Sequence, residues 1–265
     1  MYVSYCICNS EDPAQEAIQE RRYPALSSVT RANAPGLPRW RFALQLAIVI
    51  ALIALFGWTM SASDTIDAGF WPKFYLLARM ALLVLLCTWF LRQSGERWAD
   101  VGLRRPPRWW TVPLLAFAGL VAVVLLSSVM ADFLPAVGLD LPQLEENHKA
   151  QGDFAEFLFY ATLVAFGSAG FGEELIARGF MLDRFAKLIG SSSTSAFLVA
   201  IILQASVFGL FHLYQGWGGA LVTGLVGLLI GLIWLLGGRN LWACILLHGI
   251  VDLIAAIEAY TGPGA

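Results

Sequence analysis

Apolar residues along this chain fall into long blocks that are separated by short polar segments. The blocks cover roughly 40–60, 71–92, 110–131, 154–187, 195–213, 217–237 and 240–258. A helix needs about 20 consecutive, mostly apolar residues to cross a bilayer. The pattern therefore predicts an all-α, polytopic transmembrane helical bundle of about seven spans. An eighth is expected if the long fourth block breaks at its glycine-rich segment, residues 167–172.

The overall composition agrees with a membrane protein. Hydrophobic residues make up 58% of the 265 residues and charged residues only 14%, whereas about 25% of a soluble protein is charged. The net charge of −2 does not indicate a partner, and the lack of a basic tract argues against nucleic acid. The four cysteines do not have the spacing of a disulfide framework or of a zinc site.

Basic residues recur in alternate loops, and this sets the expected orientation. Arginine and lysine gather at the end of the first polar segment and after the second, fourth and sixth blocks, while the other loops are acidic. By the positive-inside rule the N-terminus is then cytoplasmic and the C-terminus lies outside. We expect a flexible cytoplasmic tail (1–38), three N-terminal spans with an outer loop (39–150) and a C-terminal transmembrane core (151–260).

Three charged residues stand in the middle of the apolar fourth block. A charge at the bilayer centre costs at least about 2.5–3.5 kcal/mol, so Glu173, Glu174 and Arg178 call for a reason. Glu174 and Arg178 are four residues apart and can pair on one helix face. Glu173 is rotated by roughly 100° and stays free. This predicts a structural ion pair beside a working acid or base; the alternative is a solvated helix end at the membrane surface.

Two of the three histidines also lie in apolar blocks. His212 follows Phe208 by four residues, and His248 precedes Asp252 by four, so each pair shares a helix face. His148, in contrast, lies in the acidic outer loop, where we expect it to be solvated. Burying these groups separately would cost more than gathering them in one polar intramembrane cavity. We therefore expect a shared site.

Such a cluster can hydrolyse a peptide bond. A glutamate and a histidine that converge on one water can deprotonate it, and a second histidine with an acid four residues on can bind the oxyanion that forms. Two histidines and a carboxylate are also a usual zinc set, although the His-Glu-x-x-His motif is absent. A metal is therefore not required but zinc is possible, and no other cofactor is expected.

The charged motifs occur in a characteristic order. They read Glu173-Glu174-Leu-Ile-Ala-Arg178, then Phe208-Gly-Leu-Phe-His212, then His248-Gly-Ile-Val-Asp252. Over roughly residues 150–258 the chain resembles the CAAX-protease and bacteriocin-processing family of intramembrane proteases, also called the Abi family. That family is usually described as glutamate-dependent, although it was once read as metal-dependent.

The resemblance implies roles for these residues. Glu173 and His212 would activate the water, and His248 with Asp252 would form the oxyanion site. The candidate catalytic residues are Glu173, Glu174, His212, His248 and Asp252, with Arg178 and Phe208 as structural or orienting residues. The substrate would be a membrane-embedded or lipid-anchored peptide. Aspartate rather than asparagine at position 252 favours the broad bacterial branch over the prenyl-protein branch, and hence a bacterial plasma membrane.

Other functions stay open at this point. One is a non-proteolytic immunity or scaffold protein of the same fold. Another is an ion- or proton-coupled transporter, although the chain has no internal repeat of the kind common in transporters.

Two packing expectations follow as well. Catalysis requires Glu173 and His212 at one depth. We expect residues 154–163 to lie in the outer interface, so that the crossing runs about 164–187, and the fifth span to extend past His212 towards Trp217; the shared site fails if neither holds. The pair Gly227 and Gly231 allows close helix packing, which we expect within the chain more than between copies. The oligomeric state is not indicated.

Overall fold

The computed structural model describes residues 37–61, 70–142, 152–191 and 193–262. The chain divides into two units, Met1–Leu37 and Pro38–Ala265, and nearly all described residues belong to the second. The predicted tail, except for its last two residues, and His148 lie outside the described residues.

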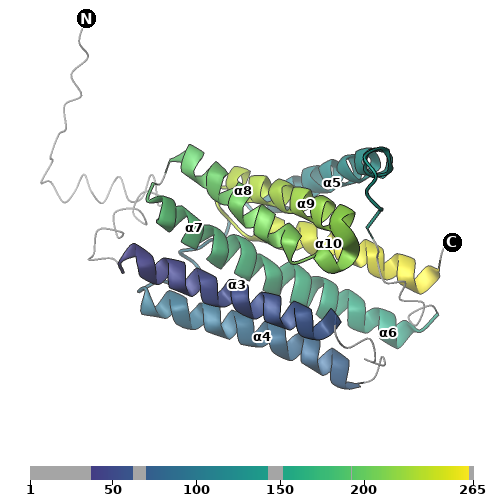
Figure 1. Ribbon diagram of the computed structural model, residues 1–265, viewed down its shortest axis with the longest axis horizontal. Coiled ribbons are helices and arrows are strands. Elements are labelled where there is room, and N and C mark those ends of the chain that lie inside the picture. Colours follow the sequence, from purple (N-terminus) through teal and green to yellow (C-terminus); the bar gives the residue numbers. More distant parts are fainter. Residues whose placement is uncertain (1–36, 62–69, 143–151, 192, 263–265) are drawn as a thin grey trace, which may run out of the picture. The chain divides into compact units, whose positions relative to one another are not determined.

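The described elements are all helices, which confirms the predicted fold class (Figure 1). They are α3 (Arg39–Ser61), α4 (Phe70–Gln93), α5 (Thr111–Ala136), α6 (Phe154–Phe159), η3 (Tyr160–Glu173), η4 (Leu175–Met181), α7 (Leu182–Ile189), α8 (Thr194–Leu210), η5 (Leu213–Gln215), α9 (Gly216–Leu236) and α10 (Trp242–Thr261). Within the described part of the chain, 6 helices are long and apolar enough to cross a membrane, and α8 is shorter. The protein is thus an integral multi-pass membrane protein.

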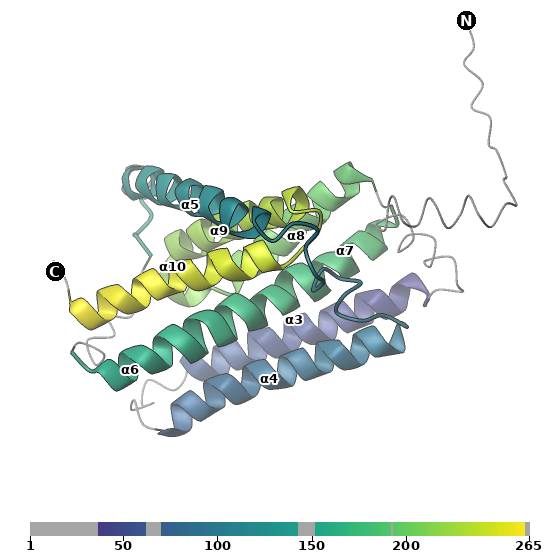
Figure 2. The same ribbon diagram turned by 180° about the vertical axis from the view of Figure 1, so that it is seen from behind.

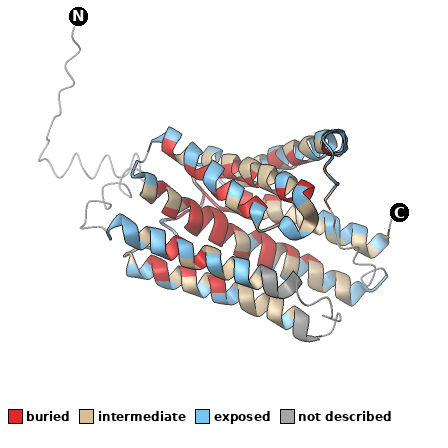
Figure 3. Ribbon diagram, in the orientation of Figure 1, coloured by how far each residue is buried: buried red, intermediate tan, exposed pale blue. Residues whose placement is uncertain are grey.

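The segments α6, η3, η4 and α7 form one continuous helix, here called the long helix (Phe154–Ile189). The chain does not break at residues 167–172, so the eight-span alternative is wrong. In Figures 1 and 2 the long helix runs between the α3–α4 pair on one side and α8, α9 and α10 on the other. Its middle is the most continuously buried segment, with every residue from 174 to 182 buried (Figure 3).

Much of the long helix has π-type hydrogen bonding, over Tyr160–Glu173 and Leu175–Met181. The N–H of Leu182, for example, donates to the carbonyl of Ala177, five residues earlier. Such bonding is rare and occurs often at functional sites. The apolar pattern gave no sign of it, because a block that is apolar on most faces is compatible with either kind of helix.

The turn between α8 and α9 corrects one expectation. Helix α8 ends at Leu210, and the chain then passes through a short 3₁₀ turn, so the fifth span does not continue past His212 towards Trp217. Gly216 permits the reversal because it adopts a φ of 82°, which an L side chain rarely tolerates. In Figures 1 and 2 the α8–α9 hairpin turns back before the C-terminal end of α10.

Glycines let two helix pairs, α8 with α9 and η3 with α10, approach closely inside the chain. A Cβ atom on Gly209 of α8 would lie 2.9 Å from the Cα of Gly224 on α9, and one on Gly231 would lie 2.6 Å from the Ile201 side chain. A Cβ on Gly170 of η3 would lie 3.1 Å from the Cα of Gly249 on α10. Gly231 of the pair Gly227 and Gly231 thus packs against α8 of the same chain, as expected.

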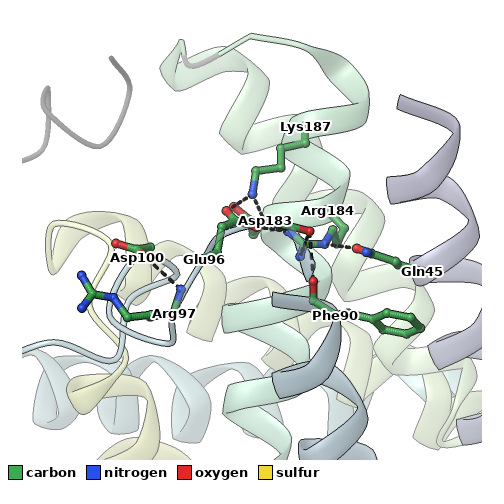
Figure 4. A network of polar contacts seen from close by, with 9 residues as sticks. Gln45, Phe90, Glu96, Arg97, Asp100, Asp183, Arg184 and Lys187 are labelled. Atoms are coloured by element: carbon green, nitrogen blue, oxygen red, sulfur yellow. Dashed lines mark hydrogen bonds and ion pairs between the residues drawn. The ribbon is translucent and has the colours of Figure 1, made fainter. Parts of the chain in front are cut away.

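A polar network ties α3 and α4 to the long helix (Figure 4). Arg184, which the basic pattern placed at the cytoplasmic end of the fourth block, is fully buried in α7. Its Nε donates to Gln45 Oε1 of α3 at 2.9 Å, and its Nη1 donates to Glu96 Oε2 at 2.8 Å. Lys187 contacts both Glu96 and Asp183. The two halves of the bundle therefore meet at a neutralised charge cluster.

Candidate active site

Glu174 and Arg178 form the predicted ion pair at the centre of the bundle. Both side chains are 0% exposed, and Arg178 Nη1 donates to Glu174 Oε1 at 2.7 Å. Nη2 of the same arginine donates to the Gly227 carbonyl of α9 at 3.0 Å. The guanidinium also lies over the Phe208 ring of α8, 4.6 Å from its centre. A buried charge pair needs such additional contacts to offset its desolvation.

The same oxygen of Glu174 also accepts a hydrogen bond from α10. His248 of α10 lies with its Nδ1 2.7 Å from Glu174 Oε1. An ionised carboxylate only accepts, so we assign the proton to Nδ1. The other nitrogen, Nε2, lies 3.9 Å from Asp252 Oδ1 on the same face of α10, as the four-residue spacing predicts. Glu174 thus orients His248 as well as pairing with Arg178, which the spacing alone did not indicate.

His212 lies in the turn after α8 rather than on the helix itself. Its Nδ1 is 2.8 Å from the Phe208 carbonyl oxygen, and a carbonyl can only accept, so Nδ1 carries the proton and Nε2 keeps its lone pair. The predicted aromatic wall is present: the Phe208 ring centre lies 4.8 Å from that of His212 and 6.2 Å from that of His248. One ring therefore contacts both imidazoles and joins the second and third motifs.

Glu173 is the carboxylate that stays free. It is half-buried and makes no hydrogen bond or ion pair with any residue that the structure describes. It follows Gly172, whose missing side chain admits α4: a Cβ there would lie 2.6 Å from the Met80 Sδ. The charge of Glu173 acts on both His248 and Asp252. Glu173 is therefore near the cluster, and its approach to His212 stays a prediction.

Three residues near this cluster were not among the candidates. Tyr214 is largely exposed and lies 5.7 Å from the His212 ring, within reach of the charges of Glu173 and of Arg79 on α4. Gln204 is buried in α8. Arg79 and Gln204 could have been found as single polar residues in apolar blocks. Tyr214 carried no such signal, because its position depends on where α8 ends.

The described side chains do not form a metal-binding set. No group of three or more His, Cys, Asp or Glu side chains in the described ranges is arranged to hold a metal ion. Nδ1 of each intramembrane histidine is engaged, by Glu174 or by the Phe208 carbonyl, so Nε2 is the nitrogen that could bind a metal. The possible zinc site stays a prediction, and the reaction proposed for these residues uses no metal.

Comparison with known proteins agrees with this geometry. Residues 155–254 match the family model described as Type II CAAX prenyl endopeptidase Rce1-like. The matched segment contains all three motifs, which confirms the resemblance to CAAX proteases. No curated protein and no solved structure matches the chain.

Proposed function

We propose that the protein is an intramembrane endopeptidase, because residues 155–254 match the Rce1-like family model. It hydrolyses a membrane-embedded or lipid-anchored peptide with a water that Glu173 and His212 activate. The observation that carries this proposal is the 2.7 Å contact between His248 Nδ1 and Glu174 Oε1. This contact fixes one imidazole near an unpaired glutamate inside the helical bundle.

The proposed reaction begins with a water held between Glu173 and Nε2 of His212. The water oxygen attacks the peptide carbonyl carbon while its proton passes to Glu173, in ordinary general base catalysis. The resulting oxyanion accepts a hydrogen bond from Nε2–H of a doubly protonated His248. The C–N bond then breaks, and the proton held by Glu173 passes to the leaving amine. No covalent enzyme intermediate forms.

Asp252 acts through His248 in this proposal. An ionised carboxylate has no hydrogen to donate, so Asp252 does not bind the oxyanion itself. At 3.9 Å from Nε2 of His248 it instead favours the imidazolium form and limits the rotation of the ring. An asparagine at this position could donate a hydrogen bond to the oxyanion directly. Because position 252 differs in this way from the prenyl-protein branch, the cleavage assay compares prenylated and unmodified peptides.

We place the protein in a bacterial plasma membrane with its N-terminus in the cytoplasm. The matching family model is described as a CAAX prenyl endopeptidase, which suggests prenylated CAAX proteins as one substrate class. Two internally quenched peptides, one prenylated at a C-terminal CAAX sequence and one unmodified, cover that class and the broader class of membrane peptides. Both can be presented to the purified protein in proteoliposomes.

The decisive variant is Glu173→Gln. Removing the general base should lower the cleavage rate by about 10²–10⁴-fold, with no change in thermal unfolding, because Glu173 has no partner among the described residues. Glu258→Gln, on the exposed face at the end of α10, is the matched control and should cleave normally. Cleavage that persists in Glu173→Gln would refute the mechanism. If the wild-type protein cleaves neither peptide, the scaffold or immunity function gains support.

A further inference from the structure

Gln204 is a fully buried amide in α8 that makes no hydrogen bond. Its exposure is 0%, and neither Oε1 nor Nε2 has a partner among the described residues. An unpaired buried polar group destabilises the fold, because its lost hydration is not replaced. Such groups are few in native proteins, and each calls for an explanation.

The unpaired atoms of the neighbouring ion pair complement this amide. Arg178 Nε and Glu174 Oε2 are also buried without a partner. Arg178 Nε is a donor and Gln204 Oε1 an acceptor, while Glu174 Oε2 is an acceptor and Gln204 Nε2 a donor. The other unpaired atom among the described buried side chains, Trp234 Nε1, packs instead near Gly102.

Contacts place Arg178 against the turn of α8 that begins at Gln204. The guanidinium lies over the ring of Phe208, which is four residues after Gln204 and therefore on the same helix face. Gly227 of α9 packs close to both Arg178 and this turn of α8. A Cβ there would lie 3.4 Å from Arg178 Nη2 and 3.6 Å from the Cα of Ala205.

The same long helix already contains one buried arginine held by a glutamine. Arg184 Nε donates to Gln45 Oε1 at 2.9 Å, and both residues are buried. Arg178 lies six residues earlier in the same helix. Its Nε lacks the equivalent partner, although a glutamine lies on the facing helix.

We propose that Gln204 is a positioning residue of the active site. Its Oε1 accepts from Arg178 Nε and its Nε2 donates to Glu174 Oε2, directly or through one bridging water. The amide thereby holds the Glu174 carboxylate in the orientation that fixes His248. Its effect on catalysis rests on the function proposed above, whereas its coupling to Arg178 does not.

The first test is Gln204→Leu in the proteoliposome cleavage assay. Losing hydrogen bonds to a charged pair should lower kcat about ten-fold, with KM unchanged. The pH profile of kcat should also change, because His248 is held less firmly. The Tm should also fall, because Arg178 Nε and Glu174 Oε2 are then left buried without a partner.

Gln45→Leu is the matched control, because it removes the equivalent amide from Arg184, away from the site. It should lower the Tm and leave kcat unchanged. A Gln204→Leu variant with unchanged kcat and an unchanged pH profile would overturn the proposal.

A second measurement does not depend on activity. The Tm of wild type, Gln204→Leu, Arg178→Lys and the double variant form a thermodynamic cycle. Lysine lacks the Nε donor, so the Tm change caused by Gln204→Leu should differ between the two backgrounds. Additive Tm changes would overturn the proposal; coupled Tm changes in a protein that cleaves no peptide would sustain it and refute the proposed function. If Arg178→Lys does not fold, Glu174→Gln takes its place in the cycle.

Discussion

At the scale of single residues, one carboxylate oxygen organises the site. Glu174 Oε1 accepts from Arg178 and from His248, so two other motif residues depend on one buried atom. Glu173, its neighbour in sequence, has no described partner. The adjacent glutamates therefore divide into a structural group and a group that is free to react.

This division predicts that substituting Glu174 destabilises the protein and that substituting Glu173 does not. Glu174→Gln leaves the Arg178 cation buried without its counter-charge, which should lower the free energy of unfolding by roughly 3–5 kcal/mol. Glu173→Gln should leave it nearly unchanged. Denaturant unfolding in detergent measures both. Equal effects of the two substitutions would contradict the division.

Sequence reasoning reached most of these residues because charge inside an apolar block is conspicuous. It found the pairing of Glu174 with Arg178 from their spacing, and the shared faces of the two histidine motifs in the same way. It did not find the hydrogen bond between Glu174 and His248, because spacing along the chain does not show which helices are neighbours. It also passed over Gln204, whose amide is uncharged.

At the scale of helices, block lengths predicted the spans to within a few residues. Two features of the helices were missed. Helix α8 ends at Leu210 because a glycine-permitted turn follows, and His212 reaches the cluster from that turn. The π-type bonding of η3 and η4 was also missed, since backbone bonding leaves no trace in hydrophobicity.

Close packing of η3 on α10 predicts sensitivity at one glycine. A Cβ on Gly170 would meet backbone atoms of α10, the Ile245 oxygen at 3.0 Å and the Gly249 Cα at 3.1 Å. Gly170→Ala should push the helices apart, cost about 1–3 kcal/mol and reduce cleavage by weakening the Glu174–His248 contact.

Gly167→Ala is the control for this prediction, because a Cβ there would meet only the Thr162 carbonyl of its own helix, at 3.4 Å. It should be tolerated in both assays. A Gly170→Ala variant that is as stable and active as Gly167→Ala would show that the close approach is not needed.

At the scale of the whole molecule, the long helix joins two sets of helices through two arginines. Arg184 connects it to α3 and to the turn that follows α4, and Arg178 connects it to α8 and α9. The expected three-part division of the chain stays a prediction. The Arg184 network packs the N-terminal spans against the C-terminal part of the long helix, away from the two glutamates.

The central claim is that Glu173, His212 and His248 face one site, and paired cysteines test it most directly. The four native cysteines are first replaced by alanine, and cysteine pairs at 173–212, 173–248 and 212–248 are then cross-linked in native membranes. Position 173 paired with Ile254, which is 40% exposed on α10, serves as the control. We predict efficient cross-linking of all three pairs and none of the control. A folded protein in which 173–212 fails to cross-link would contradict the account, because the water could not then contact both groups.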